Sequence, residues 1–170
     1  IATDSISDYF FVTEDSAVNN LLREGKCSDR IFFVGNTMID SLVSMLSALR
    51  KDRYDKNPYA VLTLHRPSNV DNRDRFTELL EAALEISTSV PIYFPVHPRT
   101  QDKILRFNLS KLFKDKRLCA LPPLSYCDFI HLCRDSSLLI TDSGGIQEEA
   151  AYLRLPCLTL RNSTERPITV

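Results

Sequence analysis

The stretch TDSGGIQEEA, residues 141–150, combines the residue types of a phosphate-binding helix start. The chain has only four glycines, and Gly144 and Gly145 form its one adjacent pair. Because glycine has no Cβ, it lets a phosphate oxygen approach the free backbone N–H groups of a first helical turn. Ser143 is well suited to cap the same helix. The pattern therefore indicates a site where a phosphorylated ligand meets the backbone.

Two acidic residues, Glu148 and Glu149, follow one helical turn later. A carboxylate at this distance from a phosphate cradle suits the two hydroxyls of a ribose, which favours a nucleotide as the ligand. The alternative interpretation is purely structural. Asp142 or Ser143 is then an ordinary N-cap, the glycines serve a tight turn, and the helix dipole explains the acidic residues. A Gly-Gly pair is a weaker signal than a Walker loop, so both interpretations stay open at this point.

A helix start cannot be the whole binding site. It contributes about 0.3 to 2 kcal/mol to a nearby charge, whereas micromolar binding needs about 8 kcal/mol. The ends of two predicted strands offer further groups: LTLHRPSN contains His65 and Arg66, and FPVHPRT contains His97 and Arg99. A lone histidine is usually structural, but two at successive strand ends, each followed closely by arginine, favour a site. His131, inside the predicted helix DFIHLCRD, is interpreted as structural.

The elements that must position these residues alternate between strand and helix. Strand candidates are residues 9–13, 30–35, 59–65, 91–97, 117–124, 136–141 and 156–160, and helix candidates are residues 14–25, 36–53, 74–86, 100–107, 126–133 and 145–153. No hairpin signal such as Asn-Gly occurs, so we predict an α/β fold with a Rossmann-like, doubly wound parallel sheet. Ligands bind such sheets beyond the carboxyl ends of the strands, where TDSGG lies.

Composition excludes several kinds of partner. The formal net charge is -1 and the pI is near 6.3, which gives no electrostatic reason to expect nucleic acid or an anionic membrane. No apolar run reaches the length of a membrane span and the first residues do not resemble a signal peptide, so we expect a cytoplasmic protein. The five cysteines include no C-x-x-C pair and are interpreted as buried free thiols. No metal or redox cofactor is predicted.

Length and chain ends bear on domain organisation. The 170 residues favour one domain, or one domain with an attached piece of another. The polar segment KNPY, residues 56–59, interrupts the alternation and is interpreted as a linker. The chain opens at Ile1 without an initiator methionine and stops at ERPITV without a closing helix. We therefore expect a fragment or excised domain.

Segments along nearly the whole chain resemble the non-hydrolysing UDP-N-acetylglucosamine 2-epimerases. In order, they are EDSAVNNLLREG, VGNTMIDSL, TLHRPSNVDN, PVHPRT, LPPLSYCDFIHL, TDSGGIQEEAAYL and LRNSTERP. TDSGGIQEEA with the later TERP is the specific signature. The resemblance implies one half of a glycosyltransferase-B-type enzyme, in which UDP-sugar lies between two Rossmann-like domains. It also implies interconversion of UDP-GlcNAc and UDP-ManNAc by elimination and re-addition of UDP, without a cofactor and in a homodimer.

The resemblance assigns roles to residues of the first motif. Matching positions imply that Ser143, Gly144 and Gly145 hold the diphosphate of UDP-GlcNAc or UDP. Glu149 corresponds to the residue that binds the ribose hydroxyls. His65 corresponds to a residue beside the phosphates that helps UDP to leave, and is the candidate catalytic residue.

Other positions are matched with less defined roles. Phe129 matches the position whose backbone contacts uracil, while Arg66 and His97 line the same cleft and Arg166 of TERP supports it. One departure concerns regulation. Bacterial members read H-R-R-E-N where this chain reads HRPSN, so Ser68 replaces an acidic residue linked to activation by a second UDP-GlcNAc. The substitution speaks against that activation here.

The resemblance also divides the chain. Residues 1–55 correspond to the end of the N-terminal Rossmann-like domain and the interdomain segment, and residues 56–170 to a truncated UDP-binding C-terminal domain. The family's proton-transferring carboxylates and an essential lysine belong upstream of Ile1. We therefore expect UDP binding with little or no epimerisation by the isolated chain. The alternatives are the donor-nucleotide domain of a glycosyltransferase of the same architecture and a non-catalytic sugar-nucleotide sensor.

Overall fold

The computed structural model of the chain describes residues 1–49, 52–114, 116–163 and 169. The chain divides into two compact units, Ile1–Ser44 and Met45–Val170. The predicted assignment of residues 1–55 and 56–170 to two Rossmann-like domains stays a prediction. Arg166, a predicted site residue, lies outside the described residues.

The first unit contains a short parallel strand pair. Its elements are α1 (Ala2–Ser5), β1 (Phe10–Val12), α2 (Asp15–Arg23), a 3-10 turn (Ser28–Arg30), β2 (Ile31–Phe33) and the beginning of α3 (Thr37–Ala48). β1 and β2 pair in parallel, with Phe10 opposite Ile31, and Leu21 of α2 packs against Phe10. The predicted order of strand, helix, strand and helix is confirmed. Helix α3 ends at Ala48 rather than residue 53, because the apolar spacing that predicted it ends at Leu49.

The second unit is built on a five-stranded parallel sheet. Its strands are β3 (Ala60–Thr63), β4 (Ile92–Pro95), β5 (Leu118–Leu121), β6 (Leu138–Thr141) and β7 (Cys157–Thr159). They lie in the order β5-β4-β3-β6-β7, and every neighbouring pair is parallel, as predicted. The chain starts at the central strand β3, builds outwards on one side, and then crosses to β6 on the other. The topological switch point, where such sheets bind ligands, therefore lies between β3 and β6.

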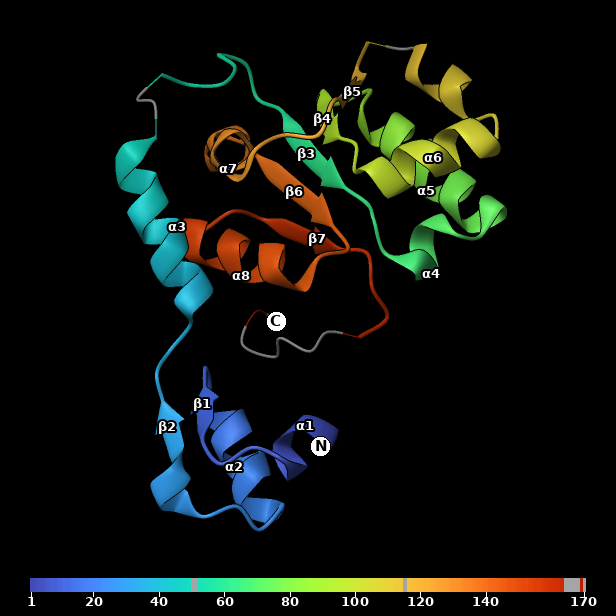
Figure 1. Cartoon of the computed structure of the whole chain (residues 1–170). Coiled ribbons are helices and arrows are strands. Elements are labelled where there is room, and N and C mark those ends of the chain that lie inside the picture. The colour runs from blue at the N-terminus through green and yellow to red at the C-terminus, as the bar shows by residue number, and fades with distance from the viewer. Residues whose placement is uncertain (50–51, 115, 164–168, 170) are drawn as a thin grey trace. The chain divides into compact units, whose positions relative to one another are not determined.

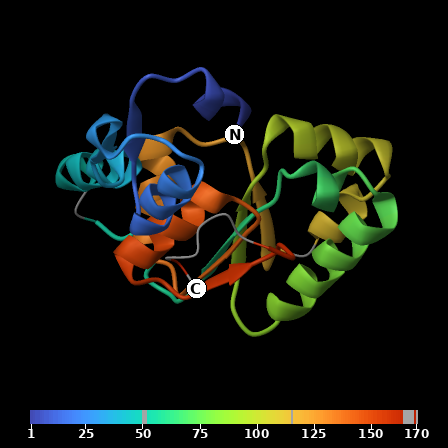
Figure 2. The same cartoon turned by 90° about the horizontal axis from the view of Figure 1, so that it is seen from below.

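Helices cover both faces of this sheet. They are α4 (Pro67–Val70), α5 (Arg73–Ile86), α6 (Pro98–Arg106), a 3-10 turn (Ser110–Lys114), α7 (Tyr126–Arg134) and α8 (Gly144–Leu153). Figures 1 and 2 show α5 and α6 on one face and α7 and α8 on the other, so the doubly wound class is confirmed. The single turn α4 and the 3-10 turns were not anticipated, since segments this short show no helical periodicity. No helix among the described residues is long and apolar enough to cross a membrane.

Successive strand residues contribute to two separate cores. Ala60 and Leu62 of β3 pack in the cluster under α5 and α6, whereas Val61 packs in the cluster under α7 and α8. In β6, Ile140 belongs to the first cluster and Leu139 to the second. Because both faces of the sheet are buried, these strands are apolar throughout rather than alternating.

The structure tests the predicted burial of His131 and of the five cysteines. His131 is buried on α7, and its Nε2 lies 2.8 Å from the carbonyl oxygen of Asp52, in agreement with a structural role. The five cysteines are free, but the prediction that they are buried is right only for Cys133. Cys157 is exposed because β7 is an edge strand, and Cys27 lies in an exposed loop.

Candidate functional site

The site is built on two loops at the switch point. One loop joins β3 to α4 and carries His65 and Arg66, and the other joins β6 to α8 and carries Asp142 and Ser143. The last residues of the two strands, Thr63 and Thr141, lie opposite each other, and their buried hydroxyls are 2.6 Å apart. The N–H of Ser143 donates to the Thr141 hydroxyl at 3.0 Å. These hydrogen bonds fix the point at which both loops leave the sheet.

The glycine pair forms the first turn of α8. Ser143 is the N-cap, and its hydroxyl accepts from the N–H of Ile146 at 3.5 Å. Neither Gly144 nor Gly145 has a positive φ, so the backbone itself does not require glycine at either position. The tight-turn interpretation therefore loses its support. N–H groups in a first helical turn have no carbonyl partner within the helix, so a ligand that approaches this turn closely can bind them.

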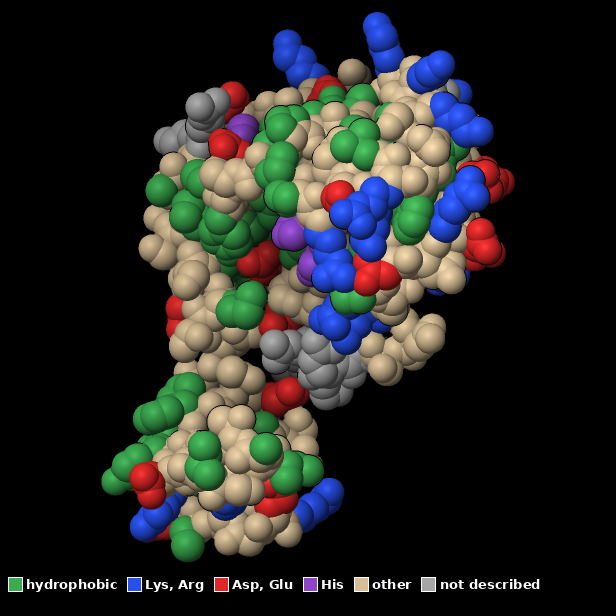
Figure 3. Space-filling view, turned by 45° about the vertical axis from the view of Figure 1, so that its right-hand side comes forward, with side chains coloured by type: hydrophobic (Ala, Val, Ile, Leu, Met, Phe, Trp, Pro, Cys, Tyr) green, Lys and Arg blue, Asp and Glu red, His purple; other side chains and the backbone are tan. Residues whose placement is uncertain are grey.

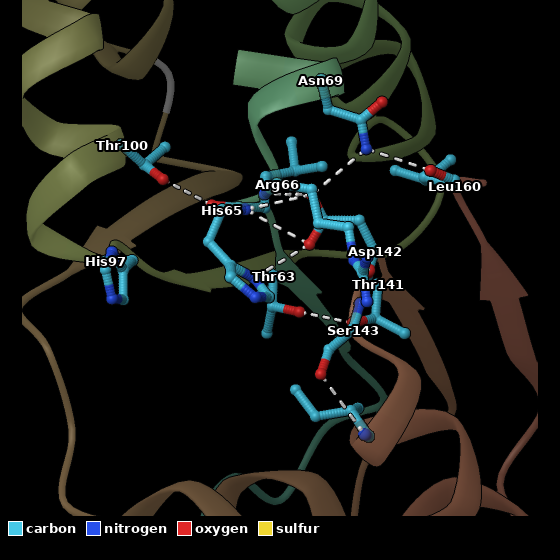
Figure 4. Close-up of polar contacts among 12 residues, drawn as sticks. Thr63, His65, Arg66, Asn69, His97, Thr100, Thr141, Asp142, Ser143 and Leu160 are labelled. Carbon is cyan, nitrogen blue, oxygen red and sulfur yellow. Dashed lines mark hydrogen bonds and ion pairs between the residues drawn. The ribbon is translucent and has the colours of Figure 1, made fainter. Parts of the chain in front are cut away.

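Asp142 lies at the centre of the hydrogen bonds in Figure 4. Its side chain is fully buried and accepts hydrogen bonds from the backbone N–H groups of His65 and Arg66, at 3.1 and 2.8 Å. The Asn69 side-chain amide donates to the same oxygen at 3.1 Å and to the Leu160 carbonyl at 3.0 Å. His65 Nδ1 lies 2.9 Å from the other carboxylate oxygen. Asp142 thus joins the two loops of the switch point.

These donors decide the charge of Asp142. Burial alone would raise the pKa of its carboxyl group, but the hydrogen bonds from the His65 side chain, the Arg66 N–H, the Asn69 amide and the His65 N–H outweigh burial. The pKa of Asp142 is therefore lowered, and the side chain is an anion at neutral pH.

Stability should accordingly fall in acid through Asp142. Because its folded-state pKa lies below the unfolded value of about 3.9, the stabilisation is fully present above that value and is lost as pH falls through the folded-state pKa. We expect urea midpoints measured from pH 7 down to pH 3 and below to fall more steeply for the natural chain than for Asp142→Asn, which has no group to protonate there. Equal slopes would show that Asp142 contributes nothing to acid sensitivity.

A pocket of about 330 Å³ opens beside these loops. It is lined by Thr63, Leu64, His65, Pro95, His97, Pro98, Pro123, Leu124, Phe129 and Ile146. The pocket thus brings together three predicted site residues, His65, His97 and Phe129, from the loops after β3 and β4 and from α7. Figure 3 shows histidine side chains on this face, beside lysine and arginine side chains.

The two histidines of this pocket have different partners. Their ring centroids are 5.8 Å apart, and both rings are accessible to solvent. His97 is the N-cap of α6, and its Nδ1 accepts from the N–H of Arg99 at 3.2 Å. An accepting Nδ1 places the proton of neutral His97 on Nε2. His65 instead faces the Asp142 carboxylate through Nδ1, so the two rings differ in the nitrogen that carries the proton.

The predicted arginines do not join the histidines in this pocket. Arg66 Nε donates to the Asp142 carbonyl at 2.8 Å, and its side chain lines a second pocket of about 510 Å³ with Arg75 and Arg161. Arg66 has an extended backbone before Pro67, and successive side chains of an extended chain point to opposite sides. His65 and Arg66 therefore diverge. Arg99 forms an ion pair with Asp71 at 2.6 Å.

Glu149 is buried one turn after Ile146, which places both side chains on the same side of α8. The Tyr126 hydroxyl donates to Glu149 Oε1 at 2.8 Å. Burial is the main cause that raises the pKa of Glu149; Tyr126 opposes the shift, and Glu148 adds to it. A carboxylate has about four acceptor positions, so the bond to Tyr126 leaves Glu149 able to accept from ligand hydroxyls.

Sequence reasoning missed the central residue of the site. Asp142 entered it only as a possible N-cap, and Asn69 and the pair of threonines did not enter it at all. The sequence did contain a signal that Asp142 has a special role. Asp142 directly follows the apolar run LLIT, whose composition predicts a strand buried on both faces, so the aspartate should be buried as well. Buried aspartates are rare unless they are paired. Asn69 gave no such signal, since its two acceptors come from distant parts of the chain.

Comparison with known proteins identifies the family of the chain. The sequence profile of the family described as UDP-N-acetylglucosamine 2-epimerase matches residues 1–170. The UDP-N-acetylglucosamine 2-epimerases of Methanocaldococcus jannaschii and Methanococcus maripaludis are 41% and 39% identical to the chain over 182 residues. Both alignments cover 100% of this chain and 50% of the relative, so the chain spans about half the length of these curated relatives.

A solved structure extends the similarity to three dimensions. The crystal structure of the Methanocaldococcus jannaschii UDP-GlcNAc 2-epimerase in complex with UDP-GlcNAc and UDP superposes with a TM-score of 0.90 at 41% identity. The superposition covers 98% of this chain and 49% of that one. The match over the whole chain, in sequence and in fold, shows that the chain belongs to the UDP-N-acetylglucosamine 2-epimerase family.

Proposed function

We propose that this chain is the UDP-binding part of an isomerase that interconverts UDP-GlcNAc and UDP-ManNAc by elimination and re-addition of UDP. The single observation that supports this best is the crevice at the switch point. There the glycine start of α8, the His65 loop and an adjacent pocket meet at the carboxyl ends of β3 and β6. The similarity to a crystal structure that contains UDP-GlcNAc and UDP supports the same ligand.

Each part of UDP has a suitable group in this arrangement. The diphosphate is assigned to the N–H groups of Gly144 and Gly145 and to the Ser143 hydroxyl, at the helix start where the dipole favours negative charge. Uracil is assigned to the largely apolar pocket that includes Phe129 and Ile146, since such pockets bind planar ligands with a few polar contacts. Glu149 is assigned to the ribose hydroxyls. His97 and Arg66 flank the site on two sides.

His65 is the candidate catalytic residue for departure of UDP. When the bond between the sugar and the diphosphate breaks, the electron pair stays on the diphosphate oxygen. A preorganised donor beside that oxygen stabilises the developing charge. Acid–base chemistry at the sugar carbon requires carboxylates that we assign to the first domain of the whole protein. The isolated chain should therefore bind UDP with little or no epimerisation, and the dimer and cytoplasmic location stay predictions for the whole protein.

Calorimetric titration of the chain with UDP tests the binding half of this proposal. We expect saturable binding at submillimolar UDP and its loss in Ser143→Trp, because the indole occupies the space before the first turn of α8. Circular dichroism of both proteins checks that the variant is folded. Absence of binding at millimolar UDP, or equal affinity of a folded Ser143→Trp, would disprove the assignment.

The catalytic half is tested on the full-length parent protein. Incubation with UDP-GlcNAc, with and without a sugar acceptor, should give UDP-ManNAc in both cases, detected by anomeric proton NMR. Transfer of GlcNAc to the acceptor without formation of UDP-ManNAc would instead identify a glycosyltransferase of the same architecture.

A further inference from the structure

The contact between Asp142 and His65 joins two loops and also fixes the position of the His65 imidazole at the pocket. Asp142 is fully buried, while the His65 side chain is 40% exposed. Figure 4 shows the imidazole of His65 between the Asp142 carboxylate on one side and the ring of His97 on the other. His65 lines the pocket and Asp142 does not, so the imidazole lies between the carboxylate and the pocket.

The two carboxylate oxygens of Asp142 have different surroundings. Oδ2 accepts from the Arg66 N–H, the His65 N–H and the Asn69 amide. Oδ1 faces His65 Nδ1 at 2.9 Å and a more distant His65 N–H at 3.2 Å. An ionised carboxylate only accepts hydrogen bonds, so Nδ1 must be the donor and carry a proton. In neutral His65 the lone pair is therefore on Nε2.

This arrangement determines what Nε2 can do. A second proton on the ring has to bind at Nε2, and the resulting imidazolium lies in direct contact with its counter-ion. Among the described residues, two other charged or titratable groups lie close to this contact: His97, at 5.8 Å between ring centroids, and Arg66, whose Nε donates to the Asp142 carbonyl. Asp142 is the negatively charged group among Asp142, His97 and Arg66.

We propose that Asp142 is a positioning residue, which holds His65 by Nδ1 and serves as the counter-ion of its imidazolium form, so that Nε2–H of the imidazolium donates to the diphosphate of UDP. The inference rests on the proposed function for the identity of the ligand. The ring takes up this Nε2 proton from solvent, and no proton needs to leave the ring. The donor stabilises the bound diphosphate, and in the whole enzyme it stabilises the negative charge that forms when UDP departs.

Asp142→Asn gives a specific test. Oδ2 receives three donors, so the amide oxygen should occupy that position and the amide NH2 should face Nδ1 of His65. Nδ1 then becomes an acceptor, and the proton of the neutral ring moves to Nε2. Two-dimensional 1H–15N spectra of the imidazole rings report this directly. The chain has only three histidines, and the signals of His65 are assigned by their absence in His65→Asn.

UDP affinity is the second readout. We expect Asp142→Asn to bind UDP about tenfold or more weakly, as loss of a charge-assisted hydrogen bond implies. In a His65→Asn background the same substitution should change the affinity less than about twofold, since contacts that act through one residue are not additive. Ile104→Val is the control for a loss of stability alone, because Ile104 is buried in the core under α5 and α6 and its apolar side chain cannot form a hydrogen bond with Asp142 or His65. It should lower the melting temperature but keep the proton on Nδ1 and the UDP affinity within about threefold.

Several outcomes would overturn the proposal. One is a proton on Nε2 of neutral His65 in the natural chain, which decides the question even if Asp142→Asn does not fold. Another is an Asp142→Asn protein that loses only stability, as Ile104→Val should. If the natural chain fails to bind UDP, the proposed function fails instead, and the imidazole spectra still decide whether Asp142 sets the proton position.

Discussion

Gly145→Ala is expected to weaken UDP binding by about 10- to 100-fold while raising the melting temperature of the chain. Gly145 is half-buried in the first turn of α8 and has no positive φ, so alanine fits the backbone there. Replacing a helical glycine by alanine stabilises by about 0.5 to 1 kcal/mol. If the diphosphate lies against this turn as proposed, the added methyl group should block its approach to the N–H groups, and loss of a hydrogen bond to a charged ligand costs about 1.5 to 3 kcal/mol.

Opposite signs for stability and binding make this variant informative. Calorimetry with UDP and a thermal melt of the same sample measure both quantities. Ala151→Gly, at an exposed position of the same helix, is the matched control. It should lower the melting temperature and leave UDP binding unchanged. If Gly145→Ala bound UDP as well as the natural chain does, the diphosphate would not lie against this turn.

Phe94→Ala should strongly lower the free energy of unfolding of the second unit. Phe94 is in β4, is fully buried, and stacks on Phe113 with ring centroids 6.2 Å apart. Truncation of a buried phenylalanine costs about 3 to 5 kcal/mol, because transfer free energy is lost and a cavity remains. The melting temperature should therefore fall by on the order of 10 °C.

Leu105→Ala provides the comparison for this effect. Leu105 lies on α6 and is 59% exposed, so its truncation removes little buried surface and should change the unfolding free energy by about 0.5 kcal/mol or less. Urea unfolding of both variants at pH 7 measures the difference. Similar losses for Phe94→Ala and Leu105→Ala would contradict the assignment of Phe94 to the core under α5 and α6.

The parallel sheet could be predicted because its signals are local. Apolar runs such as LLIT and the helical spacing of residues 74–86 each report one element, and strict alternation of strand and helix allows few other topologies. Short elements escaped prediction for the same reason. Helix α4 spans only Pro67–Val70, and its place depends on Asn69 bonds to Asp142 and Leu160, which lie far away in sequence.

The site was predictable only where a motif coincides with a strand end. Ser143, Gly144 and His65 were placed at the correct edge of the sheet, because topology alone brings them there. The directions of the side chains were not predictable. His65 and Arg66 are neighbours in sequence but line different pockets, and which pocket each one lines depends on the backbone angles before Pro67.

The bonds of Asp142 have a consequence for the thermodynamics of ligand capture. Backbone N–H groups of the β3–α4 loop are held to a residue of the β6–α8 loop before any ligand arrives. The conformational entropy of these segments is therefore lost during folding and does not oppose association. UDP should enter a rigid receptor, and the backbone of residues 64–66 and 142–145 should superpose closely between the free and the bound chain.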